Sequence, residues 1–524
     1  MSYQSAKRIP LSEKQWIFAG GFVDNANNFE LAPHFSPYLR NVRLDGQWVV
    51  ARPWCTEFVS LTSWSYPKGI GTNAVTNKLI VRHNTDSTHK LYNVAEDGTL
   101  ESIDTSTNIT SDNRMNFTNA GDTVYCLNGS DNFGKLVWTT YTTPSTWISN
   151  FAPAFSVIFN SSHWASWCST NPNKVYKSVW DNFEDFNSTW SDQFTFEEAI
   201  TGLCANNEAL FYFTKNTISV TGKSDILEAS WSLTYNTTKL TTKEWSNYHN
   251  TVVTAWTSIY YLSNSNSINQ IARWNNINWF EIIGLSDRKY KGITKILWTL
   301  DKDQSSAFGY FLPEEMLVKW HVKTAGSTIN DLIIVYDIEK DAFLVDNGKY
   351  FYGGLYFNGK NYTISIVEPK VFYDEIYNDD DGTAIQWEYR TKEFYISEPT
   401  MQKLLRESRT LLDVNELAQV NQSIYLDGIS RDSKTLLWNS YVDNSWWIGI
   451  WSVGEESVWD NGWDSEEEYT ETYILRDKWH LWQTPQRKKV QRRFTGWTIW
   501  EKVRLKNISA RIEMKSELST NLTK

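Results

Sequence analysis

Short strand-like runs separated by polar turns recur from about residue 59 to residue 370, and they constrain the fold more than any other feature. The runs are rich in β-branched and aromatic residues, and the gaps hold Gly, Asn or Asp, a pattern typical of antiparallel strands. An open sheet of roughly 300 residues would expose long edges, which radial repetition into β-propeller blades avoids. At about 40–45 residues a blade, the region would hold about six or seven blades; two packed β-sandwiches are the alternative. The clearest runs are residues 78–81, 90–94, 123–127, 209–213, 216–220, 258–262, 332–337 and 359–366. Three pairs are expected to be two strands joined by a polar turn: 78–81 with 90–94, 209–213 with 216–220, and 332–337 with 359–366.

The flanks of this region have a different character. Residues 1–58 form an arm punctuated by Gly and Pro, in which Asp45 and Gly46 separate two apolar runs and predict a hairpin. After residue 371, residues 384–391 indicate a strand and residues 400–412 a short helix or a long strand. The sequence therefore predicts an all-β chain: an N-terminal arm (1–58), a β-propeller region (59–370) and a C-terminal β-rich platform (371–524). The platform, which the arm joins, contains a tryptophan-rich insertion at about 440–485.

Charge and cysteine usage narrow the range of partners. The net charge is −11, so we expect no broad grip on duplex DNA, because binding phosphates needs clustered Lys and Arg. An acidic surface could line a passage through which DNA slides, or could simply confer solubility. The N-terminus lacks the apolar run of a signal peptide and no apolar stretch is long enough for a membrane span, so we expect synthesis in a cytoplasm and no membrane span. The thiols are expected to be core residues: Cys55, Cys126, Cys168 and Cys204.

Motifs for catalysis, metals and cofactors are weak in this sequence. It contains no G-x-S-x-G elbow, H-E-x-x-H pair, P-loop or dinucleotide fingerprint. The seven histidines show no ligand spacing beyond the loose pair His83 and His89. Asp379, Asp380 and Asp381 before a glycine suggest a calcium loop, but Tyr377 occupies the first ligand position, so a hairpin turn explains them better. Residues 130–138 approach a sialidase-type Asp box without matching it. We therefore expect neither an enzyme nor a cofactor.

Three C-terminal segments are candidates for contacts with partners. Residues 446–482 hold seven tryptophans, which suit packing in a core or an interface and, as the alternative, stacking on a glycan. The basic stretch 487–493 follows. It could contact DNA phosphates, but a salt-bridged contact with a neighbouring subunit or a solvated loop explains it better. Alternating charges at residues 502–506 suit an exposed or inter-subunit strand.

Four blocks in a fixed order resemble bacteriophage tail-hub, nozzle and packaged-DNA-stabilisation proteins. The first resembles the N-termini of these proteins, although Trp54 stands where they commonly have a glycine, and the third has Phe343 where a Trp is usual. The tryptophan-rich insertion has no counterpart in the resemblance. The first block comprises residues 20–22, 31–33, 39–43, 45–46 and 51–53; the second, residues 174–186, 199–203 and 209–218; the third, residues 335–343; and the fourth, residues 382–392.

The resemblance implies a β-propeller protein without catalytic activity that forms a ring of identical subunits, six in the short-tailed nozzles it resembles. From it we expect a virion structural protein, made in the host cytoplasm, that forms part of the channel through which genomic DNA leaves. Its other partners would be connector and tail proteins such as the adaptor, portal-proximal proteins and fibres. The alternative function is a receptor- or glycan-binding tail protein.

In such a ring, the charged clusters are expected at the channel and at the contacts between subunits. Cations on the channel wall would add points at which DNA sticks, so acidic residues are expected at the lumen or rim and the basic stretch at a subunit contact. The candidates for the lumen or rim are Asp379, Asp380, Asp381, Glu466, Glu467 and Glu468. The candidates for inter-subunit contacts are Arg487, Lys488, Lys489, Arg492, Arg493, Trp459 and Trp463.

Overall fold

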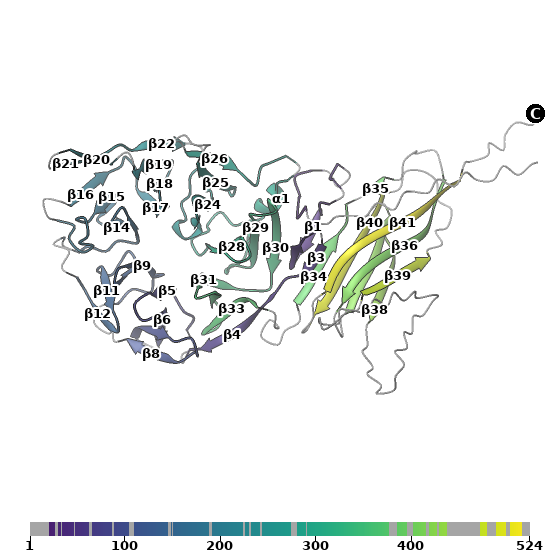
Figure 1. The fold of residues 1–524 in the computed structure, drawn as a ribbon, viewed down its shortest axis with the longest axis horizontal. Coiled ribbons are helices and arrows are strands. Elements are labelled where there is room, and N and C mark those ends of the chain that lie inside the picture. Colours follow the sequence, from purple (N-terminus) through teal and green to yellow (C-terminus); the bar gives the residue numbers. More distant parts are fainter. Residues whose placement is uncertain are drawn as a thin grey trace, which may run out of the picture. The chain divides into compact units, whose positions relative to one another are not determined.

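The computed structural model gives the chain two compact units, which are considered separately (Figure 1). The platform unit comprises Met1–Trp54, Ala342–Val345 and Tyr377–Lys524, and the propeller unit comprises Cys55–Asp341 and Asp346–Ile376. The structure describes residues 20–26, 30–32, 34–46, 48–61, 65–85, 88–103, 109–144, 148, 150–187, 191–223, 226–229, 232–241, 244–273, 280–289, 291–376, 385–392, 394–395, 402–414, 419–426, 429–437, 472–478, 489–498 and 503–515.

Seven four-stranded antiparallel sheets follow one another along the chain and are arranged as blades around a centre (Figure 1). The chain contains a seven-bladed β-propeller. In chain order the blades are blade 1, β5 (Gly69–Asn73), β6 (Lys78–Thr85), β7 (Thr88–Val94) and β8 (Leu100–Ile103); blade 2, β9 (Asn116–Ala120), β10 (Thr123–Leu127), β11 (Gly134–Val137) and β12 (Thr140–Thr142); blade 3, β13 (Phe155–Phe159), β14 (Ser162–Cys168), β15 (Asn171–Lys177) and β16 (Asp192–Thr195); blade 4, β17 (Ile200–Ala205), β18 (Ala209–Thr214), β19 (Ile218–Gly222) and β22 (Thr238–Thr241); blade 5, β23 (Val253–Ala255), β24 (Ser258–Leu262), β25 (Ile268–Arg273) and β26 (Phe280–Gly284); blade 6, β27 (Phe308–Leu312), β28 (Leu317–Val322), β29 (Leu332–Asp337) and β30 (Ala342–Asn347); and blade 7, β31 (Phe351–Phe357), β32 (Lys360–Ser365), β33 (Lys370–Ile376) and β4 (Trp54–Ser60).

Blade 7 closes the ring with strands from two distant parts of the chain. Its first three strands end at Ile376, and its fourth strand is β4, which precedes blade 1. The first strand of blade 7 also lies beside the first strands of blades 6 and 1. The sheet that begins and ends the circle is therefore held together by main-chain hydrogen bonds between an N-terminal and a much later segment.

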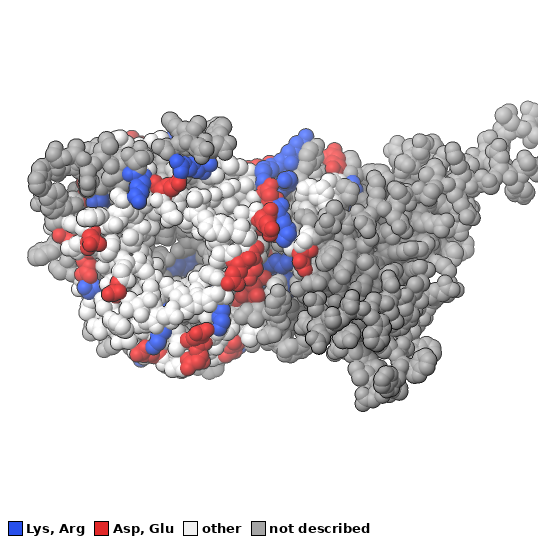
Figure 2. Space-filling model, in the orientation of Figure 1, with Lys and Arg blue, Asp and Glu red and all other residues white. Residues whose placement is uncertain are grey.

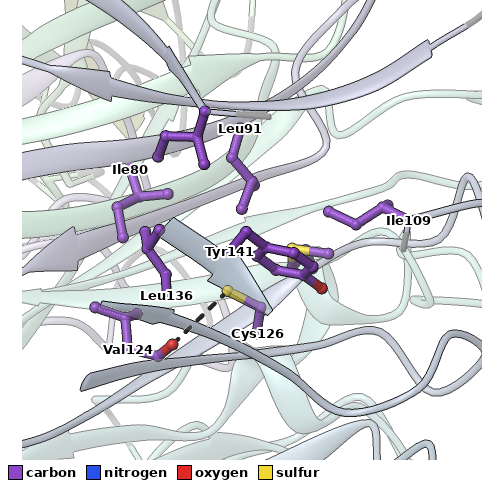
Figure 3. Packing of buried hydrophobic residues seen from close by; sticks show 9 residues of the cluster. Ile80, Leu91, Ile109, Val124, Cys126, Leu136 and Tyr141 are labelled. Atoms are coloured by element: carbon purple, nitrogen blue, oxygen red, sulfur yellow. Dashed lines mark hydrogen bonds between the residues drawn. The ribbon is translucent and has the colours of Figure 1, made fainter. Parts of the chain in front are cut away.

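The propeller cores lie between adjacent blades. Figure 3 shows one of them, in which Ile80 and Leu91 of blade 1 meet Val124, Cys126 and Leu136 of blade 2. Because each blade is covered on both faces, central strands such as β18, β28 and β29 are buried along their whole length. Such strands have continuous apolar sequences instead of alternating ones.

The platform unit contains two sheets, and both combine strands from the arm with strands from the C-terminal third of the chain. One sheet has the order β1 (Tyr38–Arg40), β34 (Ile385–Arg390), β40 (Lys489–Thr498), β37 (Gln419–Leu426) and β38 (Ile429–Leu437), with β35 (Phe394–Tyr395) also paired to β40. The other has the order β2 (Val42–Asp45), β3 (Trp48–Ala51), β41 (Val503–Lys515), β36 (Gln402–Val414) and β39 (Thr472–Lys478).

Helical structure is limited to short turns in the described residues. These are a 3-10 turn, η2 (His249–Thr251), and one α-helical turn, α1 (Thr294–Leu297). An additional hairpin, β20 (Ile226–Ala229) and β21 (Ser232–Tyr235), lies in the connection between β19 and β22. No helix in this part of the chain is long and apolar enough to cross a membrane.

The predicted all-β fold with a propeller is confirmed, and the two-sandwich alternative is wrong. The expected hairpin at Asp45 and Gly46 joins β2 to β3, and residues 402–414 form the long strand rather than the helix. One pairing was wrong: the runs 332–337 and 359–366 belong to blades 6 and 7, because β30 and β31 lie between them. The expected exposed strand at 502–506 begins β41, which is paired on both sides with β3 and β36.

Candidate functional site

Most residues predicted to act at a site lie outside the described residues. This applies to Asp379, Asp380, Asp381, Glu466, Glu467, Glu468, Trp459, Trp463, Arg487 and Lys488. Lys489, Arg492 and Arg493 belong to β40, whose backbone pairs Lys489 with Tyr395 and Arg493 with both Arg390 and Ser423. The end of the basic stretch is therefore a central strand of the platform, not an exposed loop.

The centre of the propeller is surrounded by the first strand of each blade. None of these seven described strands contains Asp, Glu, Lys or Arg; their residues are mainly Gly, Thr, Ser, Asn and apolar or aromatic side chains. Figure 2 shows one face of the propeller, where a central hollow has a mostly uncharged margin and a basic side chain is visible inside it. The charged residues in this view lie mainly farther from the centre.

Arg114 reaches across one end of this hollow. It precedes β9 of blade 2, yet its Nη1 donates to the carbonyl of Ala307 (3.1 Å) and its Nη2 to the carbonyls of Ser306 (3.1 Å) and Tyr352. Those acceptors lie at the starts of β27 and β31, in blades 6 and 7, which are not neighbours of blade 2. The guanidinium also stacks on the Tyr352 ring, with its Cζ 3.9 Å from the ring centroid. Burial lowers the pKa of Arg114, but arginine remains charged in proteins. The side chain therefore ties non-adjacent blades together across the axis.

A buried ion cluster joins blade 6 to blade 7. Lys319 of β28 donates to Asp374 Oδ2 (2.5 Å) and to Glu375, and the Tyr310 hydroxyl donates to the same Asp374 oxygen (2.5 Å). The three ionised side chains are at most 4% exposed. Burial alone would raise the pKa of Asp374, but Lys319 and Tyr310 outweigh it and lower that pKa. Burial and the charge of Glu375 raise the pKa of Glu315. Because the cluster is closed to solvent, it joins blades 6 and 7 through buried ion pairs and is not a site for a ligand.

The histidines and thiols of the propeller do not form reactive groupings. Burial lowers the pKa values of His83, His163 and His249 to about 4, so these rings are neutral at neutral pH. Burial raises the pKa of the Cys168 thiol to about 12, which keeps it protonated and unreactive. All four cysteines are buried and unpaired as disulfides. Across the residues that the structure describes, no group of three or more His, Cys, Asp or Glu side chains could hold a metal ion.

Three exposed tryptophans stand at the tips of two-residue turns in the propeller. Trp138 joins β11 to β12, Trp256 joins β23 to β24, and Trp180 lies in the turn closed by the bridge between Val179 and Asn182. Their exposed fractions are 60%, 53% and 69%, respectively. We call them the turn tryptophans.

Sequence reasoning missed Arg114, the ion cluster and the turn tryptophans. Lys319 had a detectable signal, because it is a lone cation within the apolar run 317–322. Two of the turn tryptophans also had one: Trp138-Thr139 and Trp256-Thr257 fill two-residue gaps between strands, where Asn-Gly or Asp-Gly is usual. Arg114 had none, since only the closed ring brings its acceptors near.

Neither a protein-family model nor a curated protein sequence matches this chain. Several solved structures are similar to it in fold. BamB from Moraxella catarrhalis is 10% identical with a TM-score of 0.40, over 64% of this chain and 93% of BamB. YCF48 bound to D1 peptide is 12% identical with a TM-score of 0.39, over 64% of this chain and 96% of YCF48. PorZ, a surface component of the type-IX secretion system of Porphyromonas gingivalis, is 10% identical with a TM-score of 0.38, over 60% of this chain and 37% of PorZ. Likeness at this level carries no argument about function.

Proposed function

We propose that this chain is a non-enzymatic structural protein of a bacteriophage tail, a hub or nozzle subunit that forms a closed ring around the DNA-exit channel. The observation that carries the proposal is the order of the four sequence blocks that resemble such proteins. In the fold, parts of all four blocks form β-strands. The first supplies β1, β2 and β3 and ends directly before β4, and the fourth supplies β34. The second block supplies parts of β15, β17 and β18 in blades 3 and 4, and the third supplies the end of β29 and the start of β30 in blade 6. The resembling segments therefore include strands of both units.

In this proposal, DNA passes between subunits and not through the centre of one propeller. Arg114 bridges blade 2 to blades 6 and 7 across one end of the hollow, so a duplex could not pass along the propeller axis without breaking these bonds. A passage wide enough for DNA would be enclosed by several copies around a symmetry axis, six if the ring is like the nozzles it resembles.

The charge of that passage remains part of the proposal. A wall of the same sign as the phosphates would let DNA run without salt-dependent sticking points. The net charge of −11 favours this, and Asp379, Asp380, Asp381, Glu466, Glu467 and Glu468 are proposed for the lumen or its rim. The basic stretch that includes Lys489, Arg492 and Arg493 is proposed to meet a neighbouring subunit instead.

The location of the chain in a particle tests the proposal directly. Mass spectrometry of purified virions should find the chain in a fixed number of copies, and a reconstruction of the tail should place those copies in a ring on the tail axis. If the chain is missing from purified particles, or is present as a single off-axis copy, the proposal is wrong.

The second candidate function is recognition of a receptor glycan. It is favoured by the tryptophan-rich segment 446–482 and by the exposed turn tryptophans, since aromatic faces stack on sugars as well as on protein. A glycan array tests it: saturable binding that is lost on Trp459→Ala or Trp256→Ala would favour the glycan-binding function over the ring.

A further inference from the structure

The turn tryptophans share one end of the propeller. In a four-stranded antiparallel blade, the turn between the first and second strands and the turn between the third and fourth strands lie at the same end. Trp256 occupies the first kind of turn, and Trp138 and Trp180 the second. Two contacts agree. Between blades 1 and 2, Asn73, the last residue of β5, donates to the Trp138 carbonyl (3.1 Å). Within blade 3, the Asp181 amide donates to the carbonyl of Ser161 (2.8 Å), which lies in the turn between β13 and β14. Trp256 packs edge-on against Phe311, near the end of β27.

The backbone is unfavourable for tryptophan at two of these three positions. Trp138 and Trp256 have φ angles of 56° and 52°, in the left-handed region that bulky residues avoid. Corresponding first turns elsewhere use residues that tolerate this region: Gly121-Asp122 in blade 2, Asn160-Ser161 in blade 3 and Asn358-Gly359 in blade 7. This chain therefore uses Gly or Asn in some of its two-residue turns, and places tryptophan in others.

Packing within the described chain does not compensate for this conformation. Each turn tryptophan is more than half exposed, and the contact of Trp256 with Phe311, at a centroid distance of 4.9 Å, leaves that side chain 53% exposed. Unfavourable backbone conformations that persist without internal compensation tend to mark functional surfaces. Tryptophan is the residue type most enriched among the hot spots of protein interfaces.

The same end of the propeller carries unpaired negative charge. Five exposed carboxylates on its turns form no ion pair with the described residues: Asp97, Asp122, Asp181, Glu314 and Glu339. Several cations there already have partners, such as Lys360 with Glu96 and Arg273 with Glu208. Lys223 is exposed at this end and offsets part of the negative charge. The surface thus suits a partner with clustered cations.

The spread of the turn tryptophans indicates the size of that partner. They belong to blades 2, 3 and 5 of seven, so they cover a large part of one propeller face. A partner that contacts all three must span several blades, as a protein surface can. In a closed ring of identical subunits the contact is heterologous, so the acidic face must match a different, basic surface of the same chain. The stretch at residues 487–493, with five Lys and Arg residues among seven, has that charge.

We propose that the turn-tryptophan face of one copy docks on the basic stretch 487–493 of a second copy, and that this contact joins neighbouring subunits in the ring. This inference rests on the proposed ring function and names its interface. The tryptophans supply the apolar anchors, and the carboxylates orient the approach of the basic segment and make the contact salt-sensitive.

Sedimentation velocity on the full-length chain over a range of concentrations tests the interface. The test variant is Trp138→Asn/Trp180→Asn/Trp256→Asn, which suits the turns, and the matched control is Trp298→Asn, because Trp298 is 78% exposed at the opposite end, between blades 5 and 6. We expect the wild type to self-associate, the triple variant to raise the dissociation constant at least tenfold, and the control to change it less than twofold. Raised salt and a synthetic peptide of residues 485–495 should both weaken association of the wild type. Circular dichroism should show that both variants are folded.

The outcomes separate this interface from the ring function itself. Wild-type protein that stays monomeric at every concentration overturns the interface, as does association that the triple variant leaves unchanged. In either case virion mass spectrometry still decides the ring function on its own. Glycan binding that is lost in the triple variant, with no self-association, would assign the face to sugars and overturn the inference. A particle lacking the chain, with association intact, would refute the tail function and leave the contact between copies standing.

Discussion

The propeller and the platform are both antiparallel β-structures, but they differ in how far apart in sequence their paired strands lie. In blade 1 the hairpin of β6 and β7 closes between Thr85 and Thr88, and most blades are complete within one continuous segment. In the platform Tyr38 is opposite Arg390, and Val49 is opposite Leu505. Local patterns can specify the propeller blade by blade, whereas the platform requires both ends of the chain. Blade 7 is the exception, since β4 makes it depend on the N-terminal region.

Two truncations should have the largest effects and should show whether the propeller folds without the platform. Deleting residues 1–60 removes β4 together with β1, β2 and β3, so we expect both units to lose cooperative unfolding. Deleting residues 377–524 removes a larger part of the chain but leaves all seven blades, so the propeller should still unfold cooperatively. Limited proteolysis and thermal denaturation by circular dichroism measure both. If the second truncation is as poorly folded as the first, the propeller is not an independent unit.

Lys319 tests whether the junction of blades 6 and 7 depends on its buried charges. Lys319→Met leaves Asp374 and Glu375 buried without their cation, and breaking a buried pair costs about 3–5 kcal/mol. The matched control is Lys360→Met, which removes the exposed pair with Glu96 and should cost about 1 kcal/mol or less. Urea unfolding monitored by circular dichroism gives both values. Similar losses in the two variants would show that the buried cluster is not a special stabilising contact.

Acid should weaken the propeller through its buried histidines. The His163 ring is enclosed by Tyr125, Phe133 and Phe186, and its folded pKa of about 4 lies below the ordinary value of 6.5. Between these values the unfolded state binds the proton and the folded state does not, so stability falls as the pH falls. One such group predicts a loss of about 2 kcal/mol from pH 7 to pH 5. Unfolding free energies of wild type and His163→Gln over this range should differ in slope, and parallel slopes would contradict the assignment.

The smallest effect is expected at a turn and has the opposite sign. Trp138→Asn places a residue that tolerates positive φ in the turn between β11 and β12, and we expect stability to rise by about 1 kcal/mol. Thr139→Asn, in the same turn, is the control and should change stability by less. Thermal denaturation at a concentration where the protein is monomeric measures both. A clear loss of stability in Trp138→Asn would mean that the indole has a stabilising role within the monomer.

Much of the propeller was predictable from the sequence because its determinants are local. Asp45 and Gly46 predicted the hairpin of β2 and β3, and the runs at 209–213 and 216–220 predicted neighbouring strands of blade 4. The role of β4 could not be predicted in this way, because its partner β33 lies more than 300 residues later. The residues of β4 contain no pattern that specifies pairing with β33. The candidate site shows the same limit. Arg114 looks like an ordinary loop cation until the closed ring brings Ala307 and Tyr352 to its guanidinium.

The closing strand has a consequence for the timing of synthesis. β4 leaves the ribosome before any blade, but its partner β33 is complete only when Ile376 has been made. At about 5–20 residues per second, the interval is on the order of tens of seconds. Throughout that interval an aromatic strand with unused main-chain hydrogen-bonding groups is exposed in a crowded cell, a hazard for pairing with other nascent chains. Yield of the intact protein should therefore depend on translation rate and on chaperones that hold residues 54–60 until the circle can close.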